Sequence, residues 1–228
     1  MNLKPPALTP RLKTIASLVQ PCSVMADIGT DHAYLPVYLC MTEKCGSAIA
    51  SDIRKGPLER AAATINKYSA AHSVKTRLGG GAETLDVGEA DCIVIAGMGG
   101  LVISDIMQAS AEVFKSTKQI ILQPMTAADE LRSFLNKNNY TILGECLAKE
   151  DEKIYNIIEV CRGKDKEYSA AEIYMGKKLI ETQPNYYDEY FKKRIHRLEK
   201  MINGLKLSSD SAAEKRLLYL SDILNELL

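Results

Sequence analysis

The fold is decided by residues 24–36, VMADIGTDHAYLP. An apolar run that ends in Asp27 and turns at Gly29 has the pattern of a buried strand leading into a nucleotide-binding loop. A pyrophosphate loop needs more glycine than this stretch contains, and the carboxylates of Asp27 and Asp31 would repel phosphate charge. The stretch therefore predicts a nucleotide-binding turn whose ligand carries positive charge.

Apolar runs on both sides of this turn alternate with helical patterns. Five runs predict strands, at residues 23–27, 47–52, 74–78, 92–96 and 119–123. Helices are expected at residues 33–42, 56–68, 101–113 and 126–137, the last capped by Thr126. The short turn between two further runs, 140–148 and 153–161, makes them antiparallel neighbours. This pattern predicts a doubly wound α/β sheet that ends in an antiparallel hairpin, as in the class I (Rossmann-like) methyltransferase fold.

The sequence changes character after residue 163, where strand patterns stop. Apolar residues then recur at helical spacing in two stripes, which predicts an antiparallel helical hairpin. The stripes are Phe191, Ile195, Leu198, Ile202 and Leu205, then Leu217, Leu220, Leu224 and Leu227. We therefore expect a sheet domain at residues 1–163 and a C-terminal helical, coiled-coil-like domain at residues 164–228.

The whole chain is electrically balanced, with 29 basic and 29 acidic residues among 228. A local basic patch can exist within a neutral total, so the balance leaves nucleic acid open as a partner. The six cysteines form no Cys-x-x-Cys pair, and no cluster has metal-ligand spacing, so reduced thiols and no metal are expected. The sequence shows no apolar signal core or membrane-spanning run, and a cytoplasmic monomer without membrane contact is expected.

S-adenosylmethionine is the hypothesis that fits the charge of the turn. Its sulfonium and ammonium suit Asp27 and Asp31, Gly29 admits it closely, and a helix beginning near Asp31 offers N–H groups to its carboxylate. Asp52 ends the second strand, 25 positions after Asp27, near the spacing of an acid that accepts from ribose hydroxyls. Ile53 follows it and is assigned to the same site. The alternative is structural, with acids that only end strands or cap a helix.

Two glycine-rich loops complete the predicted site. The loop after the third strand is expected beside the adenine of the cofactor, with an ordinary mobile loop as the alternative. It comprises Gly79, Gly80, Gly81 and Ala82. The loop after the fourth strand offers exposed backbone to a methyl acceptor, although its methionine could instead fill the core. It comprises Ala96, Gly97, Met98 and Gly99. His32 is a further candidate, but most lone histidines have structural roles.

Five segments together resemble the bacterial tRNA (adenine-22-N1)-methyltransferases. They are DIGTDHAYLP (27–36), SDIRKGPLERA (51–61), IAGMGG (95–100), ILQPM (121–125) and KIYNIIEV (153–160). The resemblance runs from Leu8 to about Cys161, and the helical tail continues it with a weaker signal. It implies a class I fold with a C-terminal coiled-coil domain that methylates N1 of a D-arm adenine in tRNA, with S-adenosylmethionine as the donor.

The resemblance also implies residue roles. Asp27, Gly29, Asp31 and His32 match the family's first cofactor motif, and Asp52 matches its ribose-binding acid. The loop on the acceptor side matches at Gly97, Met98 and Gly99. One position departs from the pattern, because relatives usually read Gly-Asp-Gly where this chain has glycine at 79, 80 and 81. A carboxylate that could accept from the adenine amino group is thereby missing at Gly80.

Catalysis is expected to depend mainly on positioning, because adenine N1 has an available lone pair. A paired or stacked target must first be flipped out. Tyr155 is expected to stack on the flipped base, with a buried strand tyrosine as the alternative, and Asp31 to stabilise the cationic product.

A phosphate-contacting surface is also required. For it we expect Arg11, Lys192, Lys193, Arg194 and Arg197, although a basic run can also be a solvated helix face.

Two other functions remain open from the residues alone. A small-molecule methyltransferase would need no basic helical appendage, and a binding module without turnover is compatible with the glycine at position 80. A dehydrogenase is disfavoured by the missing Gly-x-Gly-x-x-Gly loop and by the terminal hairpin. The sequence leaves undetermined the set of tRNAs, any general base and the orientation of the C-terminal helices.

Overall fold

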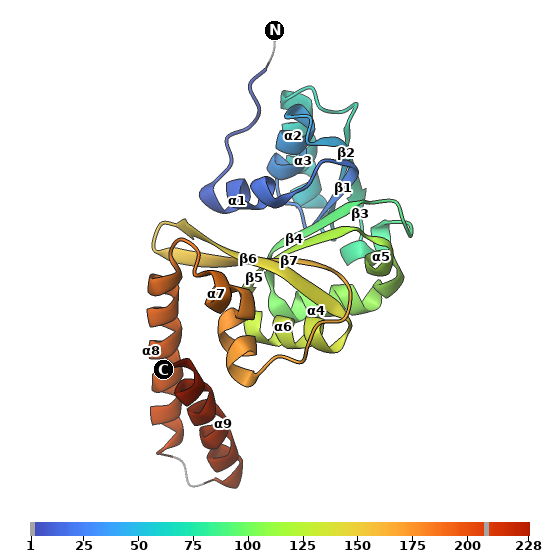
Figure 1. Ribbon diagram of the computed structural model, residues 1–228. Helices are drawn as coiled ribbons and strands as arrows, with labels where there is room; N and C mark the ends of the chain where they lie inside the picture. Colours follow the sequence, from blue (N-terminus) through green and yellow to red (C-terminus); the bar gives the residue numbers. More distant parts are fainter. Residues whose placement is uncertain (1–2, 208–209) are drawn as a thin grey trace.

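A seven-stranded mixed sheet forms the centre of the protein, as the computed structural model of residues 3–207 and 210–228 shows (Figure 1). Its strand order is β3-β2-β1-β4-β5-β7-β6, with β1 to β5 parallel and β7 antiparallel to both of its neighbours. The strands are β1 (Cys22–Ile28), β2 (Cys45–Asp52), β3 (Val74–Leu78), β4 (Cys92–Gly99), β5 (Gln119–Thr126), β6 (Tyr140–Glu150) and β7 (Lys153–Arg162). The predicted class I methyltransferase sheet, including its terminal hairpin, is confirmed.

Helices cover both faces of this sheet, so the central strands are apolar on both sides. The helices of one layer are α1 (Pro10–Leu18), α2 (Tyr34–Met41) and α3 (Lys55–Lys67), and those of the other are α4 (Gly100–Ala109), α5 (Ala111–Ser116) and α6 (Ala128–Lys137). In β4, Ile93 and Ile95 pack with the α4–α6 layer while Val94 packs with the α1–α3 layer. Each such fully buried side chain contributes roughly 1.5–3 kcal/mol.

Three helix boundaries differ from the sequence-based expectations. The helix after β1 begins at Tyr34 rather than near Asp31, because Ala33 adopts a left-handed conformation with φ 53°. Thr126 does not cap α6, because it ends β5 and the left-handed Ala127 follows it. The expected helix at 101–113 is divided into α4 and α5 at Ser110, whose φ of −116° lies outside the helical range.

The C-terminal segment consists of helices, as predicted. They are the π-helical turn η2 (Glu172–Gly176), α7 (Lys177–Thr182), α8 (Tyr187–Leu205) and α9 (Ser211–Leu227). Figure 1 shows α8 and α9 side by side, projecting away from the sheet. Leu198 and Ile202 of α8 pack against Leu220 and Ile223 of α9. The structure therefore shows a helical pair, without establishing a coiled coil.

A buried ion pair ties this segment to the sheet. Arg132 of α6 and Glu145 of β6 are joined Nε to Oε1 at 2.8 Å, and both side chains are fully inaccessible to solvent. Arg132 Nη1 also donates to the carbonyl oxygens of Ile173 at 3.1 Å and Tyr174 at 3.2 Å, both in η2. The π-helical turn that leads to α7 is thus anchored on a charged centre in the sheet domain.

Candidate cofactor and acceptor site

The predicted site lies at the carboxyl ends of the parallel strands. Among the five parallel strands β1 stands at the centre, with β2 and β3 on one side and β4 and β5 on the other. The chain therefore changes direction between β1 and β4, which is where α/β sheets of this type bind ligands. Asp27 pairs with Val94 across that junction. The cofactor residues predicted on β1 and β2 and the acceptor residues predicted on β4 consequently share one edge of the sheet.

Asp27 is the electrostatic centre of this edge. Its residue is only 9% exposed. Burial raises the pKa of Asp27 to about 6, while the Thr30 hydroxyl and the positive charge of Arg11 act to lower it. A carboxylate held out of water with so little compensation favours a ligand that brings positive charge to it.

Gly29, in the loop after β1, is in contact with Met98 near the carboxyl end of β4. Residues 97–99 were expected in a loop after this strand, but they are part of it because β4 continues to Gly99. Gly29 has a φ of +79°, which favours glycine, and its N–H donates to Ser51 O at 2.8 Å. A β-bulge at Gly97 interrupts the pairing of β4 with β5 and re-aims the residues that follow. As a result the methyl group of Met98 lies so close to Gly29 that a Cβ on residue 29 would overlap it. Met98 thus stands between the cofactor side and the acceptor side.

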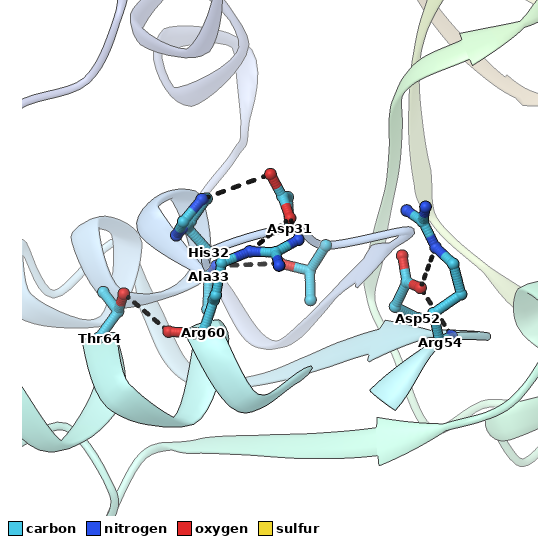
Figure 2. A network of polar contacts seen from close by, with 8 residues as sticks. Asp31, His32, Ala33, Asp52, Arg54, Arg60 and Thr64 are labelled. Atoms are coloured by element: carbon cyan, nitrogen blue, oxygen red, sulfur yellow. Dashed lines mark hydrogen bonds and ion pairs between the residues drawn. The ribbon is translucent and has the colours of Figure 1, made fainter. Parts of the chain in front are cut away.

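Asp31 lies in the same turn but has a different environment. Figure 2 shows its carboxylate between His32 and Arg60 of α3. Arg60 Nε donates to Asp31 Oδ1 at 3.1 Å, and His32 Nε2 lies 3.4 Å from Oδ2. Arg60 lowers the pKa of Asp31, whose side chain is 61% exposed. His32 stacks on Tyr34 with ring centroids 5.3 Å apart. The negative charge of Asp31 is therefore largely offset by Arg60.

Asp52 ends β2 as expected and is 7% exposed. Its Oδ1 accepts from the backbone N–H of Arg54 at 2.8 Å, a contact visible in Figure 2. This bond fixes the carboxylate at the strand end, while a second oxygen keeps its capacity to accept from a ligand. Ile53 beside it is 70% exposed, so it offers apolar surface next to the Asp52 carboxylate.

The loop after β3 lies next to Asp52. Gly79 N donates to Asp52 O at 3.1 Å, and Gly80 N donates to Glu83 Oε1 at 2.7 Å. Gly81 and the fully buried Ala82 then open a short 3₁₀ helix, η1 (Gly81–Thr84). The structure therefore brings the four predicted residues of this loop to the side of the β2 end where a base would extend from the ribose.

The acceptor side is organised by Gln123, which the sequence analysis did not select. Its Oε1 accepts from Gly97 N at 3.1 Å and from Arg11 Nη1 at 2.7 Å. Arg11 also lies 5.4 Å from the centre of the Tyr155 ring. Gln123 is fully buried at the end of β5, next to the half-buried Ala96 of β4. A buried amide within the apolar run ILQPM was the available sequence signal.

Arg11 was expected on an RNA surface, and the structure instead places it inside this cluster. It is half-buried and contributes positive charge near Asp27 as well as bonding to Gln123. Arg11 therefore connects Asp27, the bulge of β4 at Gly97 and Tyr155. Arg60 and Glu83 are two further residues that sequence reasoning missed.

The basic residues of α8 divide into two kinds. Lys192 and Arg197 are exposed, whereas Arg194 is half-buried and stacks 3.8 Å from the centre of the Tyr174 ring. Lys193 Nζ donates to Glu189 Oε1 at 2.9 Å and to Glu152 O at 3.0 Å. A cleft of about 400 Å³ separates this helix from the sheet edge. Its lining includes Thr126, Tyr155, Asn156, Lys193, Arg194 and Arg197.

Residues 3–207 and 210–228 contain neither a candidate metal cluster nor a helix that could span a membrane. Within these residues, no three His, Cys, Asp or Glu side chains are grouped so that they could hold a metal ion. None of the helices in this part of the chain combines the length and apolar character needed to cross a membrane.

The chain is similar to known tRNA methyltransferases. The family model described as tRNA (adenine(22)-N(1))-methyltransferase matches residues 25–227. The tRNA (adenine(22)-N(1))-methyltransferase of Bacillus subtilis is 39% identical over 151 residues, which cover 66% of this chain and 63% of that protein. The matched segment thus spans a little less than two thirds of that relative's length.

Solved structures agree with this similarity over nearly the full chain. The crystal structure of the tRNA methyltransferase TrmK of Bacillus subtilis is 30% identical, with a TM-score of 0.88 and coverage of 97% of this chain and 98% of that chain. A Streptococcus pneumoniae protein solved with S-adenosyl-L-methionine is 26% identical, with a TM-score of 0.84 and coverage of 96% and 100%. TrmK of M. capricolum, solved with S-adenosyl-homocysteine, is 27% identical, with a TM-score of 0.76 and coverage of 96% of each chain.

Proposed function

Because this chain belongs to the tRNA (adenine(22)-N(1))-methyltransferase family, we propose that it transfers a methyl group from S-adenosylmethionine to N1 of an adenine in the D-arm region of tRNA. The observation that carries the proposal is the poorly compensated, buried carboxylate of Asp27 at the β1–β4 junction. A cationic donor stabilises that carboxylate, whereas a dinucleotide phosphate would be repelled by it.

The side chains at the sheet edge fit S-adenosylmethionine in three respects. Asp27 offers a desolvated negative charge to the cationic end of the ligand. Asp52 presents a fixed carboxylate that can accept from two ribose hydroxyls. Ile53 presents exposed apolar surface for the face of a base. When bound, the donor supplies a methyl group on a positively charged sulfur, and the protein's task is to bind and orient the two reactants.

On the acceptor side, the residues hold and align a flat base. Tyr155 lines the cleft below α8, which suits it for stacking on a flipped adenine. Arg11 and Gln123 fix the bulged loop at Gly97, so exposed backbone is available beside that base. The proposed catalytic role of Tyr155 is stacking. For Asp31, pairing with Arg60 favours a role in holding the cofactor loop against α3 over stabilisation of the cationic product.

For tRNA, the cleft between the sheet edge and α8 is the proposed contact surface. Lys193 and Arg197 line this cleft, and Lys192 is exposed on the same helix outside its lining; all three can supply charge toward phosphates. Arg194 is proposed to supply positive charge in the same cleft. Its guanidinium is held there by stacking on the Tyr174 ring and by donating to Tyr174 O at 2.7 Å.

The proposal also covers the domain organisation of the protein, its oligomeric state, its independence of metal and its location. The chain is divided into a methyltransferase domain at residues 1–163 and a helical domain at residues 164–228, although Tyr168 already packs in the core of the sheet domain. The protein acts as a monomer without a metal ion, and it acts in the cytoplasm, where its tRNA substrate would be available. Six cysteines present as thiols are consistent with a reducing compartment.

The activity is tested with unmodified tRNA transcripts and a labelled methyl donor. Reverse transcription should stop at one D-arm adenine, because a methyl group on N1 blocks the Watson–Crick edge. A transcript with guanine at that position is the matched control and should stay unlabelled. Transfer of label to small molecules in the absence of tRNA, with none to the transcript, would contradict the proposal and favour the small-molecule methyltransferase.

The RNA surface is tested separately by charge reversal. Replacing Lys192 and Arg197 together by glutamate should weaken tRNA binding at least tenfold and leave binding of S-adenosylmethionine unchanged. Lys75→Glu, on the exposed edge strand β3, is the matched control and should have little effect. Unchanged tRNA affinity of the double variant at moderate salt would move the interface elsewhere.

A further inference from the structure

The loop after β3 contains a carboxylate that the function proposed above does not use. Glu83 is exposed, and its Oε1 accepts from Gly80 N at 2.7 Å. A Cβ built on Gly80 would stand 3.3 Å from that same Oε1 atom. The carboxylate of Glu83 therefore folds back to the place that an acidic side chain on residue 80 would occupy.

This carboxylate lies in line with the residues proposed to hold a nucleoside. Asp52 is the proposed acceptor for ribose hydroxyls. Its backbone oxygen accepts from Gly79 N of the same loop at 3.1 Å. The exposed Ile53 follows, with its Cδ1 3.4 Å from the Cβ position of residue 80. Three groups therefore lie in sequence from the end of β2 to the loop after β3. They are the Asp52 carboxylate for the ribose hydroxyls, the apolar surface of Ile53 and the Glu83 carboxylate. A base that covers Ile53 would direct its far edge at Glu83.

We propose that Glu83 is a specificity-determining residue, which accepts a hydrogen bond from the 6-amino group of the cofactor's adenine. It replaces the carboxylate that this chain lacks at Gly80. The proposal rests on the function proposed above, because it requires an adenosyl ligand in this crevice. An ionised carboxylate only accepts hydrogen bonds, so it favours the amino group of adenine and repels the carbonyl oxygen of hypoxanthine.

A purely structural role for Glu83 makes a different prediction. The bond to Gly80 N caps the first turn of η1, and a glutamine at residue 83 could maintain it through its amide oxygen. The carboxylate has two oxygens, so it can cap Gly80 and accept from a ligand at once. Glu83→Gln therefore preserves the cap while it changes what the side chain offers to a base, because the amide can donate as well as accept.

The test compares calorimetric binding of S-adenosylhomocysteine and S-inosylhomocysteine. The two ligands differ at position 6 of the base, where an amino group is replaced by a carbonyl oxygen, and at N1, which carries a hydrogen only in the inosyl ligand. We expect the wild-type protein to prefer the adenosyl ligand by at least about thirtyfold. Glu83→Gln should reduce this preference about tenfold, with an unchanged thermal melting temperature. Asp86→Asn, which neutralises another exposed acid shortly after Glu83, is the matched control and should leave the preference unchanged.

A second variant restores the acid at the other position. Gly80 has φ −91° and ψ 102°, which any residue adopts, so Gly80→Asp introduces no backbone strain. Glu83→Ala should lose the preference as well, and the double variant Gly80→Asp/Glu83→Ala, in which the truncated side chain leaves room for the new carboxylate, should regain most of it. Equal weakening of both ligands by Glu83→Gln, or an equal affinity of the wild-type protein for both, would overturn this inference alone. A wild-type protein that binds neither ligand would overturn the proposed function and this inference with it.

Discussion

Two buried carboxylates in this protein have opposite surroundings. Glu145 lies between the sheet domain and the C-terminal helices, where Arg132 pairs with it at 2.8 Å and itself makes further bonds to η2. Asp27 lies at the β1–β4 junction, where a hydroxyl and the more distant charge of Arg11 are the groups that lower its pKa. Both positions exclude water, but only Glu145 has a full counter-charge in contact.

This difference separates Glu145, whose charge supports the fold, from Asp27, whose charge we propose binds a ligand. An ion pair buried with good geometry becomes strongly destabilising when one partner is removed, because the other is left unpaired. Asp27 is a buried carboxylate without a full counter-charge in contact, and the rise of its pKa to about 6 reflects this lack of compensation. The same physical cost that would destabilise the contact between the sheet and the C-terminal helices is the basis of the affinity for a cationic ligand that we propose for the sheet edge.

The largest effect is expected at the junction. Arg132→Met leaves Glu145 charged, buried and unpaired, and frees the two carbonyl oxygens of η2. We expect a loss of about 3–5 kcal/mol in the free energy of unfolding, which corresponds to a fall of about 10 °C or more in melting temperature. Urea denaturation followed by circular dichroism measures this loss.

Two controls sharpen the result. The double variant Arg132→Met/Glu145→Leu removes both charges and should recover most of the stability. Lys178→Met breaks the exposed pair of Lys178 with Glu181, joined at 2.8 Å, and should change stability by less than about 1 kcal/mol. If Arg132→Met proves as stable as the wild type, the buried pair does not anchor the C-terminal segment.

The next effect is expected at Asp27 and has two opposite signs. Asp27→Asn removes the charge that a cationic ligand needs, so affinity for S-adenosylmethionine should fall at least about thirtyfold. The same change removes a buried charge, so the unliganded protein should gain up to about 1–3 kcal/mol of stability. Calorimetric titration and thermal melting measure the two effects on one sample. If Asp27→Asn loses stability as well as affinity, Asp27 has a structural role like that of Glu145, and the proposed role in ligand binding is contradicted.

The sequence was sufficient to predict the half of the site that rests on strand ends. Asp27 and Asp52 end apolar runs, and parallel strands bring such ends to one edge whatever the loops do. The glycines that follow β3 and those near the carboxyl end of β4 were located by the same rule. The helix starts at Tyr34 and Ala128 were misplaced, because left-handed residues at Ala33 and Ala127 carry no sequence signal comparable to glycine.

Contacts between distant segments were not predictable in the same way. Arg11 and Gln123 are 112 positions apart, and they meet because α1 packs against β6 and β7, and β7 is the neighbour of β5 in the sheet. Arg60 meets Asp31 for a similar reason, since α3 packs beside the loop after β1. Periodicity identifies the face that a residue occupies within its own element, but pairings across elements depend on how the layers are stacked.

A smaller effect is expected from pH alone. The pKa of Asp27 in the folded protein, about 6, lies above the ordinary value of 3.8 for an aspartate, so protonation stabilises the unliganded protein as pH falls through 6. Ligand binding should respond in the opposite direction, because a cation binds the ionised form. Affinity for S-adenosylmethionine should therefore fall about tenfold between pH 7 and pH 5. Titrations across this range should show no such decrease for Asp27→Asn.

The smallest effect should come from Arg11, the one partial counter-charge that Asp27 has within the described chain. Arg11→Leu removes a charge that lowers the pKa of Asp27, so the midpoint of the pH dependence should move upward by less than about one pH unit. Affinity at pH 7 should then fall only a few-fold. Arg11→Lys retains the charge but loses the guanidinium that bonds to Gln123, so it should keep the midpoint and reduce turnover. A midpoint that stays fixed in Arg11→Leu would mean that burial alone sets the pKa of Asp27, and that Arg11 serves the acceptor side only.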